Sequence, residues 1–226
     1  MNKVYNTVWN ESTGMWVVTS ELTRKGGQRP RQIKRTVLAG LVAGLLLPSQ
    51  PVLAAAYDNQ TIGSGGTSSS MSLGTGDTAT NTTINDGGFQ NVNSGGSATS
   101  TVINSGGGQL VSSGGSATDT SINKDGLQIV SSGASATNTT IVDFGKQHVS
   151  GGSATNTTIN RNGRQYISSG GSATDTSINK DGLQIVSSGA SATNTTIVDF
   201  GKQHVSGGSA TNTTINRNGR QYISSG

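Results

Sequence analysis

The sequence contains no cysteine, few aromatic residues and, over most of its length, no glutamate. Aromatic side chains make up 4% of the 226 residues, and all three prolines and both tryptophans lie before residue 55. After residue 54, aspartate is the only acidic residue. Disulfides, thiol nucleophiles, glutamate acid–base pairs and cysteine-based metal motifs are therefore excluded. We expect no catalytic residue, no metal site and no cofactor.

Positive charge is also scarce outside the N-terminal segment. Residues 1–54 hold seven of the fifteen lysines and arginines and two of the eleven acidic residues. The rest of the chain carries eight basic and nine acidic residues, so the formal net charge of +4 does not describe it. A basic balance confined to one segment gives no support for a nucleic-acid partner.

The N-terminal segment has the layout of an export signal. Its basic residues end at Arg35 and are followed by an apolar run at residues 37–47, which is too short to span a bilayer. Two prolines and the small residues of PVLAAA come next. We expect cleavage between Ala54 and Ala55, with a site two residues later as the alternative, so residues 26–54 form the n-, h- and c-regions.

Residues 1–25 precede this signal. The stretch MNKVYNTVWNESTGMWVVTSEL resembles the extended signal-peptide region of large type V secretion proteins of Gram-negative bacteria. Both its aromatic and its polar residues stand at the positions where that region has them. The resemblance implies export through the inner membrane to the periplasm and then display on the outer-membrane surface.

From residue 78 the chain is periodic. Eight units follow one another at intervals of 19, 19, 19, 18, 19, 19 and 18 residues, and the shorter units lose one residue from a Ser/Gly segment. The block 112–170 recurs letter for letter as 168–226, an offset of three units. Such a period indicates stacked turns, each with a short strand, a glycine-containing turn, a second short strand and a Ser/Gly turn.

Two apolar columns run through the aligned units. The first is Ile84, Ile103, Ile122, Ile141, Ile159, Ile178, Ile197 and Ile215, and the second is Val92, Val111, Val130, Val149, Ile167, Val186, Val205 and Ile223. A glutamine lies two residues before each member of the second column, so it shares the inward face and can form a ladder. We predict an all-β, parallel, right-handed β-solenoid; the alternative is a disordered repetitive stalk.

The predicted solenoid divides into a cap and a repeat region. Residues 55–77 resemble one degenerate unit and form the N-terminal cap, and residues 78–226 form the eight repeats. The chain stops in the repeat register, so we expect a fragment of a longer passenger. Between each inward Gln and Val the residue type varies, which indicates an exposed column. The candidate self-association face consists of Asn91, Lys146, His148, Arg164 and Tyr166.

Repeats such as GGSATNTTIN and INRNGRQYISSGG resemble the 19-residue repeats of self-associating autotransporter adhesins of the AIDA type. The resemblance implies a surface adhesin active in host-cell adhesion, autoaggregation and biofilm formation. It also implies a C-terminal β-barrel in the full-length protein. The implied partners are a cytoplasmic autotransporter heptosyltransferase, like passengers on neighbouring cells and the host-cell surface.

The same resemblance implies O-heptosylation of repeat serines. The candidate acceptors crowd Gly-rich turns, where hydroxyls are expected to be exposed: Ser94, Ser97, Ser112, Ser113, Ser116, Ser131, Ser132, Ser135, Ser150, Ser153, Ser168, Ser169, Ser172, Ser187, Ser188, Ser191, Ser206 and Ser209. Their alternative role is to close turns by side-chain hydrogen bonds.

Three other functions are alternatives to the adhesin. The repeats could be a spacer and glycosyltransferase substrate, with adhesion located elsewhere. A β-helix polysaccharide lyase is disfavoured, because the aspartates fall in turns. Ice binding would need outward threonine ladders, whereas a straight strand through Thr118, Thr120 and Ile122 would turn both threonines inward.

Overall fold

The computed structural model describes residues 5–10, 14–20 and 53–225. The chain divides into two units, residues 1–51 and residues 52–226, and each is described by itself. The expected apolar signal run at 37–47 lies outside the described residues. In the part of the chain that is described, no helix could cross a membrane.

Within the first unit, residues 5–10 and 15–20 form two paired β-strands. Strand β1 (Tyr5–Asn10) pairs antiparallel with β2 (Met15–Ser20). Trp9 lies opposite Trp16, and their rings meet edge to face with centroids 5.4 Å apart. Such cross-strand aromatic pairs stabilise hairpins by about 0.2–1 kcal/mol. The two strands lie in the stretch expected to be the extended signal region.

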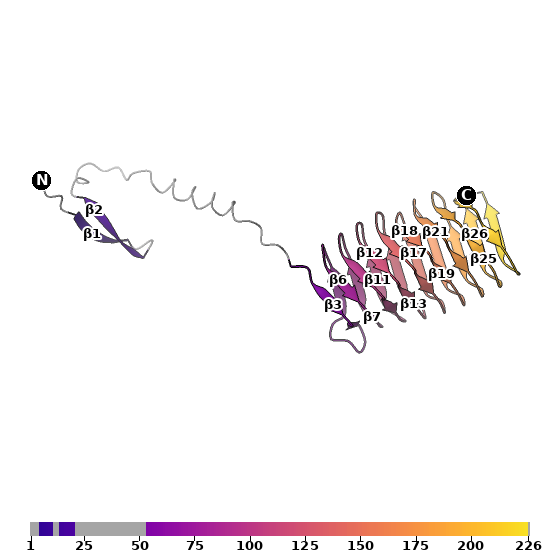
Figure 1. The fold of residues 1–226 in the computed structure, drawn as a ribbon, viewed down its shortest axis with the longest axis horizontal. Coiled ribbons are helices and arrows are strands. Elements are labelled where there is room, and N and C mark those ends of the chain that lie inside the picture. The colour runs from indigo at the N-terminus through magenta and orange to yellow at the C-terminus, as the bar shows by residue number, and fades with distance from the viewer. Residues whose placement is uncertain (1–4, 11–13, 21–52, 226) are drawn as a thin grey trace. The chain divides into compact units, whose positions relative to one another are not determined.

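The second unit is a parallel β-solenoid built from three nine-stranded sheets (Figure 1). The first sheet contains β3 (Ala56–Asp58), β6 (Thr78–Thr80), β9 (Ser97–Thr99), β12 (Ser116–Thr118), β15 (Ser135–Thr137), β18 (Ser153–Thr155), β21 (Ser172–Thr174), β24 (Ser191–Thr193) and β27 (Ser209–Thr211). The second contains β4 (Thr61–Ile62), β7 (Thr83–Ile84), β10 (Val102–Ile103), β13 (Ser121–Ile122), β16 (Thr140–Ile141), β19 (Thr158–Ile159), β22 (Ser177–Ile178), β25 (Thr196–Ile197) and β28 (Thr214–Ile215). The third contains β5 (Ser70–Leu73), β8 (Phe89–Val92), β11 (Gly108–Val111), β14 (Leu127–Val130), β17 (Lys146–Ser150), β20 (Arg164–Ser168), β23 (Leu183–Val186), β26 (Lys202–Ser206) and β29 (Arg220–Ser224).

The predicted parallel β-solenoid is confirmed, but each turn has three strands rather than two. The first expected strand is split, because the residue between the first and second sheets adopts a left-handed conformation. In all nine turns this corner residue has φ between 52° and 57°: Asn59, Asn81, Ser100, Asp119, Asn138, Asn156, Asp175, Asn194 and Asn212. Asn and Asp tolerate this region better than other residues with a side chain, which explains why they dominate the column.

The bend also corrects the expectation for the threonines. Thr120 is buried in the core, as a straight strand predicts, but Thr118 lies before the bend and is partly exposed. Thr118 therefore points away from the core, and the first sheet presents Ser116 and Thr118 on its outer side in register with their equivalents.

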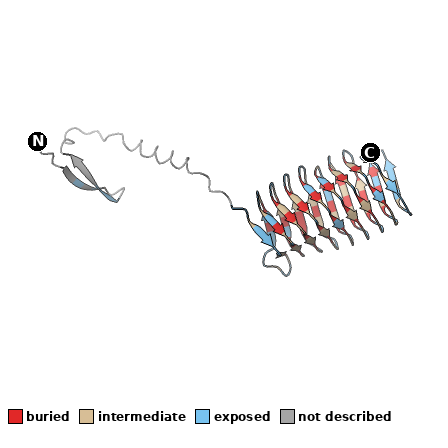
Figure 2. Cartoon of the chain, in the orientation of Figure 1, coloured by how far each residue is buried: buried red, intermediate tan, exposed pale blue. Residues whose placement is uncertain are grey.

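The core runs as a continuous column through the turns (Figure 2). From Ile84 to Ile197 the predicted isoleucine column is fully buried, and the Val column is at most 4% exposed from Val92 to Val205. A third column of alanines from the first sheet, beginning at Ala79, joins them. Each buried aliphatic side chain contributes about 1.5–3 kcal/mol, so stability grows with the number of turns.

The glutamines form the predicted ladder inside the core. From Gln90 to Gln203 they are fully buried, and each Nε2 from Gln109 onward donates to Oε1 of the glutamine in the preceding turn at 2.7–2.8 Å. Each Nε2 also lies 3.2–3.4 Å from a buried threonine Oγ1 in its own turn, such as Thr139 beside Gln147. Within the described residues no buried side-chain N or O atom lacks a partner.

Residues 55–77, the expected cap, supply β3, β4 and β5, which pair with the strands of the next turn. Met71 occupies the glutamine position there, and Gln90 Nε2 lies 3.2 Å from its Sδ. The ladder therefore begins on a side chain that accepts weakly and carries no donor of its own.

Candidate functional site

The Ser/Gly turns join the third sheet to the first, and the candidate glycosylation serines lie in these turns and at the strand ends beside them. All eighteen are at least partly exposed. Ten of them are exposed: Ser94, Ser113, Ser132, Ser135, Ser150, Ser153, Ser169, Ser188, Ser206 and Ser209. The other eight, including Ser97 and Ser116, are intermediate. Hydroxyls are thus accessible at every one of these turns.

The glycine in several of these turns leaves room for the serine of the preceding turn. Gly114 has φ +76°, and a Cβ placed there would lie 2.8 Å from Ser94 Oγ. A Cβ at Gly133 would likewise lie 2.7 Å from Ser113 Oγ. Ser94 and Ser113 therefore stack over glycine backbone, so at these turns the same sequence element sets the turn and presents the serine.

The candidate self-association residues lie on the outer side of the third sheet. Register pairs Lys146 with Arg164 and His148 with Tyr166 on the adjacent strands β17 and β20. The rings of His148 and Tyr166 have centroids 4.8 Å apart. Asn91 lies on β8, three strands from β17, so the structure brings four of the five residues together and leaves Asn91 apart.

Electrostatics at this cluster favour an uncharged imidazole. Partial burial and the positive charge of Lys146 lower the pKa of His148 below its ordinary value of 6.5. Lys146 also lies 3.5 Å from Asp125 through Nζ and Oδ1, an exposed ion pair that contributes little to stability.

The same surface recurs 56 residues later. Lys202, His204, Arg220 and Tyr222 repeat the cluster, with the His204 and Tyr222 rings 4.7 Å apart. Between the two clusters the outward residues are Leu183 and Ile185. Basic–aromatic and aliphatic bands therefore alternate along one side of the solenoid.

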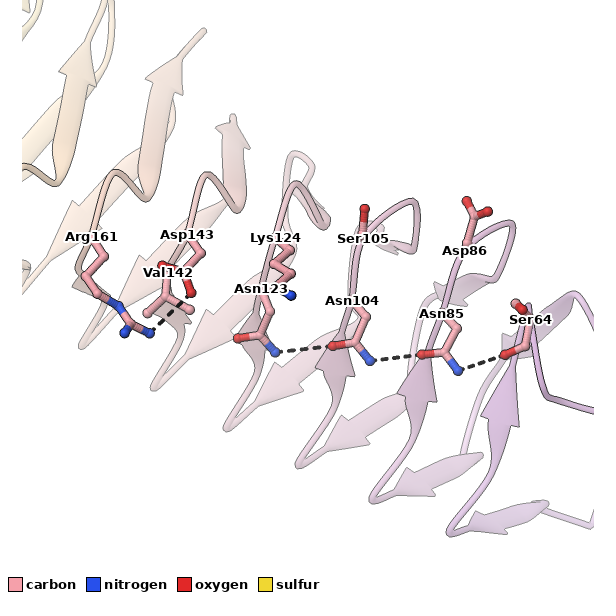
Figure 3. A pocket seen from close by; sticks show the side chains of 10 residues that line it. All are labelled: Ser64, Asn85, Asp86, Asn104, Ser105, Asn123, Lys124, Val142, Asp143 and Arg161. Atoms are coloured by element: carbon pink, nitrogen blue, oxygen red, sulfur yellow. Dashed lines mark hydrogen bonds and ion pairs between the residues drawn. The ribbon is translucent and has the colours of Figure 1, made fainter.

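A shallow groove of about 600 Å³ follows the turns between the second and third sheets (Figure 3). Three asparagine amides form a ladder on one side of it: Asn123 Nδ2 donates to Asn104 Oδ1, Asn104 to Asn85 Oδ1 and Asn85 to the Ser64 carbonyl, at 3.4, 2.9 and 2.8 Å. The ladder stops at Val142, beside the ion pair that Arg161 makes with Asp143 at 3.2 Å.

Phe144 follows Asp143 in the same tight turn and occupies an unfavourable backbone conformation. The two residues have φ +69° and +49°, and Gly145 N donates to Val142 O at 2.9 Å. Corresponding positions in the other turns hold Gly87, Gly106, Asp125, Asn162, Asp181, Phe200 and Asn218. A left-handed conformation costs a bulky residue about 1–2 kcal/mol, yet Phe144 keeps 49% of its surface exposed.

The expected cleavage site lies where the solenoid begins. Ala54 is exposed, and the backbone N–H of Ala55 donates to Asp77 Oδ1 at 2.7 Å. The N–H groups of Ala55 and Gly74 lower the pKa of Asp77 below its ordinary value. Where the chain is cut before Ala55, its new ammonium group would face this carboxylate.

Sequence reasoning missed the groove. The asparagines of its ladder follow the isoleucine column directly in the repeats, but their alignment became visible only with the register of the strands. The signal that could have identified Phe144 was its place in a turn position that, apart from its duplicate Phe200, is held by Gly, Asp and Asn.

Two protein families match the chain. Residues 1–50 match "Extended Signal Peptide of Type V secretion system". Residues 95–145 and 143–201 match "Adhesin of bacterial autotransporter system, probable stalk", the family of the AIDA adhesin. These matches agree with the two resemblances found in the signal region and in the repeats.

Two curated relatives are similar over 92 residues, or 41% of the chain. Autotransporter CRAC of Citrobacter rodentium is 80% identical, and the autotransporter adhesin/invasin TibA of Escherichia coli O78:H11 is 83% identical. The matched part spans only 6% and 9% of their respective lengths. A solved structure, the TibC-catalyzed hyper-glycosylated TibA55-350 fragment, is 40% identical, with 76% of this chain and all of that chain covered and a TM-score of 0.46.

Proposed function

Because this chain belongs to the AIDA-type autotransporters, which are exported and displayed on the outer-membrane surface, we propose that its solenoid is an adhesin that acts by display and not by catalysis. The observation that carries the proposal is the unbroken register of the outward side chains. Nine stacked turns, the last eight joined by a glutamine ladder, hold their outward side chains in columns at a constant spacing. A rigid array of this kind is suited to multivalent contact.

Self-association is the contact that the third sheet supports. A single exposed hydrogen bond contributes only about 0.5–1.5 kcal/mol, but repetition along two rigid rods adds avidity. The basic–aromatic cluster around His148 and Tyr166 recurs after three turns at His204 and Tyr222, so two rods can meet at both clusters at once. Autoaggregation and biofilm formation would follow from pairing between rods on neighbouring cells, and host adhesion from the same displayed surface.

Cell clumping tests this proposal. Both copies of the cluster must be changed, because each can act alone; we therefore choose His148→Ser, Tyr166→Ser, His204→Ser and Tyr222→Ser in one chain. Surface display should be unchanged and clumping strongly reduced. Lys124→Ala, which lies at a different turn, is the matched control. Clumping that persists in the fourfold variant at normal display would contradict the role of this face and favour a spacer, with adhesion located elsewhere.

The turn serines are proposed as the O-heptosylation sites, with an autotransporter heptosyltransferase as the partner in the cytoplasm. The proposal rests on the family resemblance and on the position of the serines, ten of which are exposed and eight partly exposed. Intact-mass measurement after co-expression with the transferase should show additions in steps of one heptose. Replacing the exposed Ser113, Ser132 and Ser188 with alanine should remove steps; an unchanged mass ladder would place the sugars at other residues.

A further inference from the structure

The groove beside the asparagine ladder is long and open. Its lining runs from Ser64 to Arg161 and follows six consecutive turns of the solenoid (Figure 3). Sites for small molecules enclose most of their ligand. A shallow groove that runs along the turns instead suits an extended chain whose units repeat at a spacing close to that of the turns, about 4.8 Å. Pyranose units in an extended polysaccharide advance by a similar distance.

The amide ladder leaves regular hydrogen-bonding capacity unused. An asparagine amide has two N–H donors and an oxygen with two lone pairs. Asn104 uses one N–H toward Asn85 and one lone pair toward Asn123, so one donor and one acceptor site remain. Successive turns thus offer the same pair of groups, which matches the hydroxyl groups of a polymer, because each hydroxyl both donates and accepts.

The charges along the groove balance. Asp86 and Asp143 oppose Lys124 and Arg161, and Asp143 is already paired with Arg161. A nucleic acid or an acidic polysaccharide would require an excess of positive charge. The balance favours a neutral ligand.

The exposed phenylalanine supplies the apolar component. Phe144 directly follows Asp143, which lines the groove, and it occupies a left-handed turn position where the other turns, apart from that of Phe200, have glycine, aspartate or asparagine. A strained residue that is not buried points to a function outside the fold. The face of a pyranose ring is a set of C–H groups, and the flat ring of Phe144 can pack against it.

We propose that this groove binds a neutral polysaccharide in an extended conformation. Asn85, Asn104 and Asn123 bond its hydroxyl groups, and Phe144 packs against a sugar ring at the end of the ladder. The inference extends the proposed adhesin by naming a ligand class, and it depends on surface display but not on self-association.

Gel retardation of the full chain by soluble polysaccharides tests the inference. The probes are hydroxyethylcellulose and glucomannan as neutral polymers and heparin as an anionic one. We expect the neutral polymers to retard the wild-type chain and heparin to leave it unretarded. Asn104→Val, which copies the residue found at Val142, should weaken binding at least fivefold. Asn179→Val is the matched control, because the same turn position there lies outside the groove lining, and it should have no effect.

The phenylalanines provide a second test that separates binding from folding. The double variant Phe144→Asn with Phe200→Asn places asparagine where another turn has Asn162 at the same position. Binding should fall at least tenfold while the thermal unfolding midpoint stays constant or rises. Absence of retardation by either neutral polymer, equal retardation by heparin, or an equal loss with Asn179→Val would overturn the inference. So would a double variant that binds normally but has lost self-association in light scattering. Clumping that persists in the fourfold His148/Tyr166/His204/Tyr222 variant, with polysaccharide binding intact, would instead count against the self-association face alone.

Discussion

The glutamine ladder makes a quantitative prediction, because the chain itself contains a natural break in it. Gln147→Met places a methionine in the ladder in the middle of the solenoid, as Met71 stands at the same position in the first turn. The volume is nearly kept, but Gln128 Oε1 loses its donor, and the bond from Gln165 Nε2 to Gln147 Oε1 is replaced by a contact with a weakly accepting sulfur. Each buried unsatisfied group costs about 1–3 kcal/mol, partly offset by the greater hydrophobicity of methionine. We expect a net loss of about 2–4 kcal/mol in the free energy of unfolding.

Guanidinium unfolding followed by circular dichroism measures this loss. With a slope of about 4 kcal/mol per molar, the midpoint should fall by about 0.5–1 M. Ile129→Met, an outward residue of the adjacent strand, is the control and should change the free energy by less than about 0.5 kcal/mol. If the two variants unfold at the same midpoint, the ladder contributes nothing beyond packing.

A double variant tests the ladder more sharply. Gln147→Met with Gln165→Met leaves orphaned only Gln128 Oε1 and Gln184 Nε2, the same number of groups as the single change. Its cost should therefore be close to that of one substitution and well below the sum of two. Simple additivity would refute the reasoning, because it would mean that each glutamine acts through its own packing.

Three further predictions concern the turns and the titratable groups. Gly171→Ala should destabilise the solenoid by more than Gly170→Ala, because a Cβ at Gly171 overlaps the Val149 carbonyl oxygen. A Cβ at Gly170 would have open space around it, so alanine is disfavoured there only by the φ of +79°. Thermal unfolding of the two variants checks this difference. The pKa of His148 is lowered in the folded chain, so between the folded pKa and 6.5 the unfolded chain binds more protons than the folded chain. The free energy of unfolding should therefore rise with pH through this window. His148→Gln should flatten this rise when unfolding is measured as a function of pH. The pKa of Asp77 is also lowered, so ionised Asp77 should stabilise the folded chain above the ordinary aspartate pKa, and this stabilisation should be lost as the pH falls through the pKa of the folded chain. Asp77→Asn should remove this loss of stability at low pH. An unchanged pH profile of unfolding would contradict the contact with Ala55.

The repeat columns carried most of the information about the fold. A period of 18–19 residues with isoleucine, valine and glutamine at constant places has few physical solutions, because one turn alone cannot offset the entropy of ordering its backbone. Stacking of identical turns solves that problem, and it also places each glutamine above its equivalent. The parallel solenoid and the inward glutamine ladder could therefore be predicted from the sequence.

The three-strand cross-section could not be predicted in the same way. The split between the first and second sheets depends on one backbone conformation per turn, at Asp119 and its equivalents. Asn, Asp and Ser are common both in the turns that flank strands and at other exposed positions. Their recurrence at this place in the repeat therefore does not by itself indicate a bend between two strands. The missed corner led to the wrong orientation of Thr118, which turns outward once the chain bends.

The sequence by itself determined the export signal, the solenoid and the residues that face its core, since periodicity in one dimension becomes stacking in three. Only the tertiary structure decided which surface residues meet. It joined His148 to Tyr166, left Asn91 apart and aligned three asparagines into one groove, because neighbours on the surface come from different turns and depend on strand register and corner angles. Local sequence specifies each turn, whereas a binding surface belongs to several turns together.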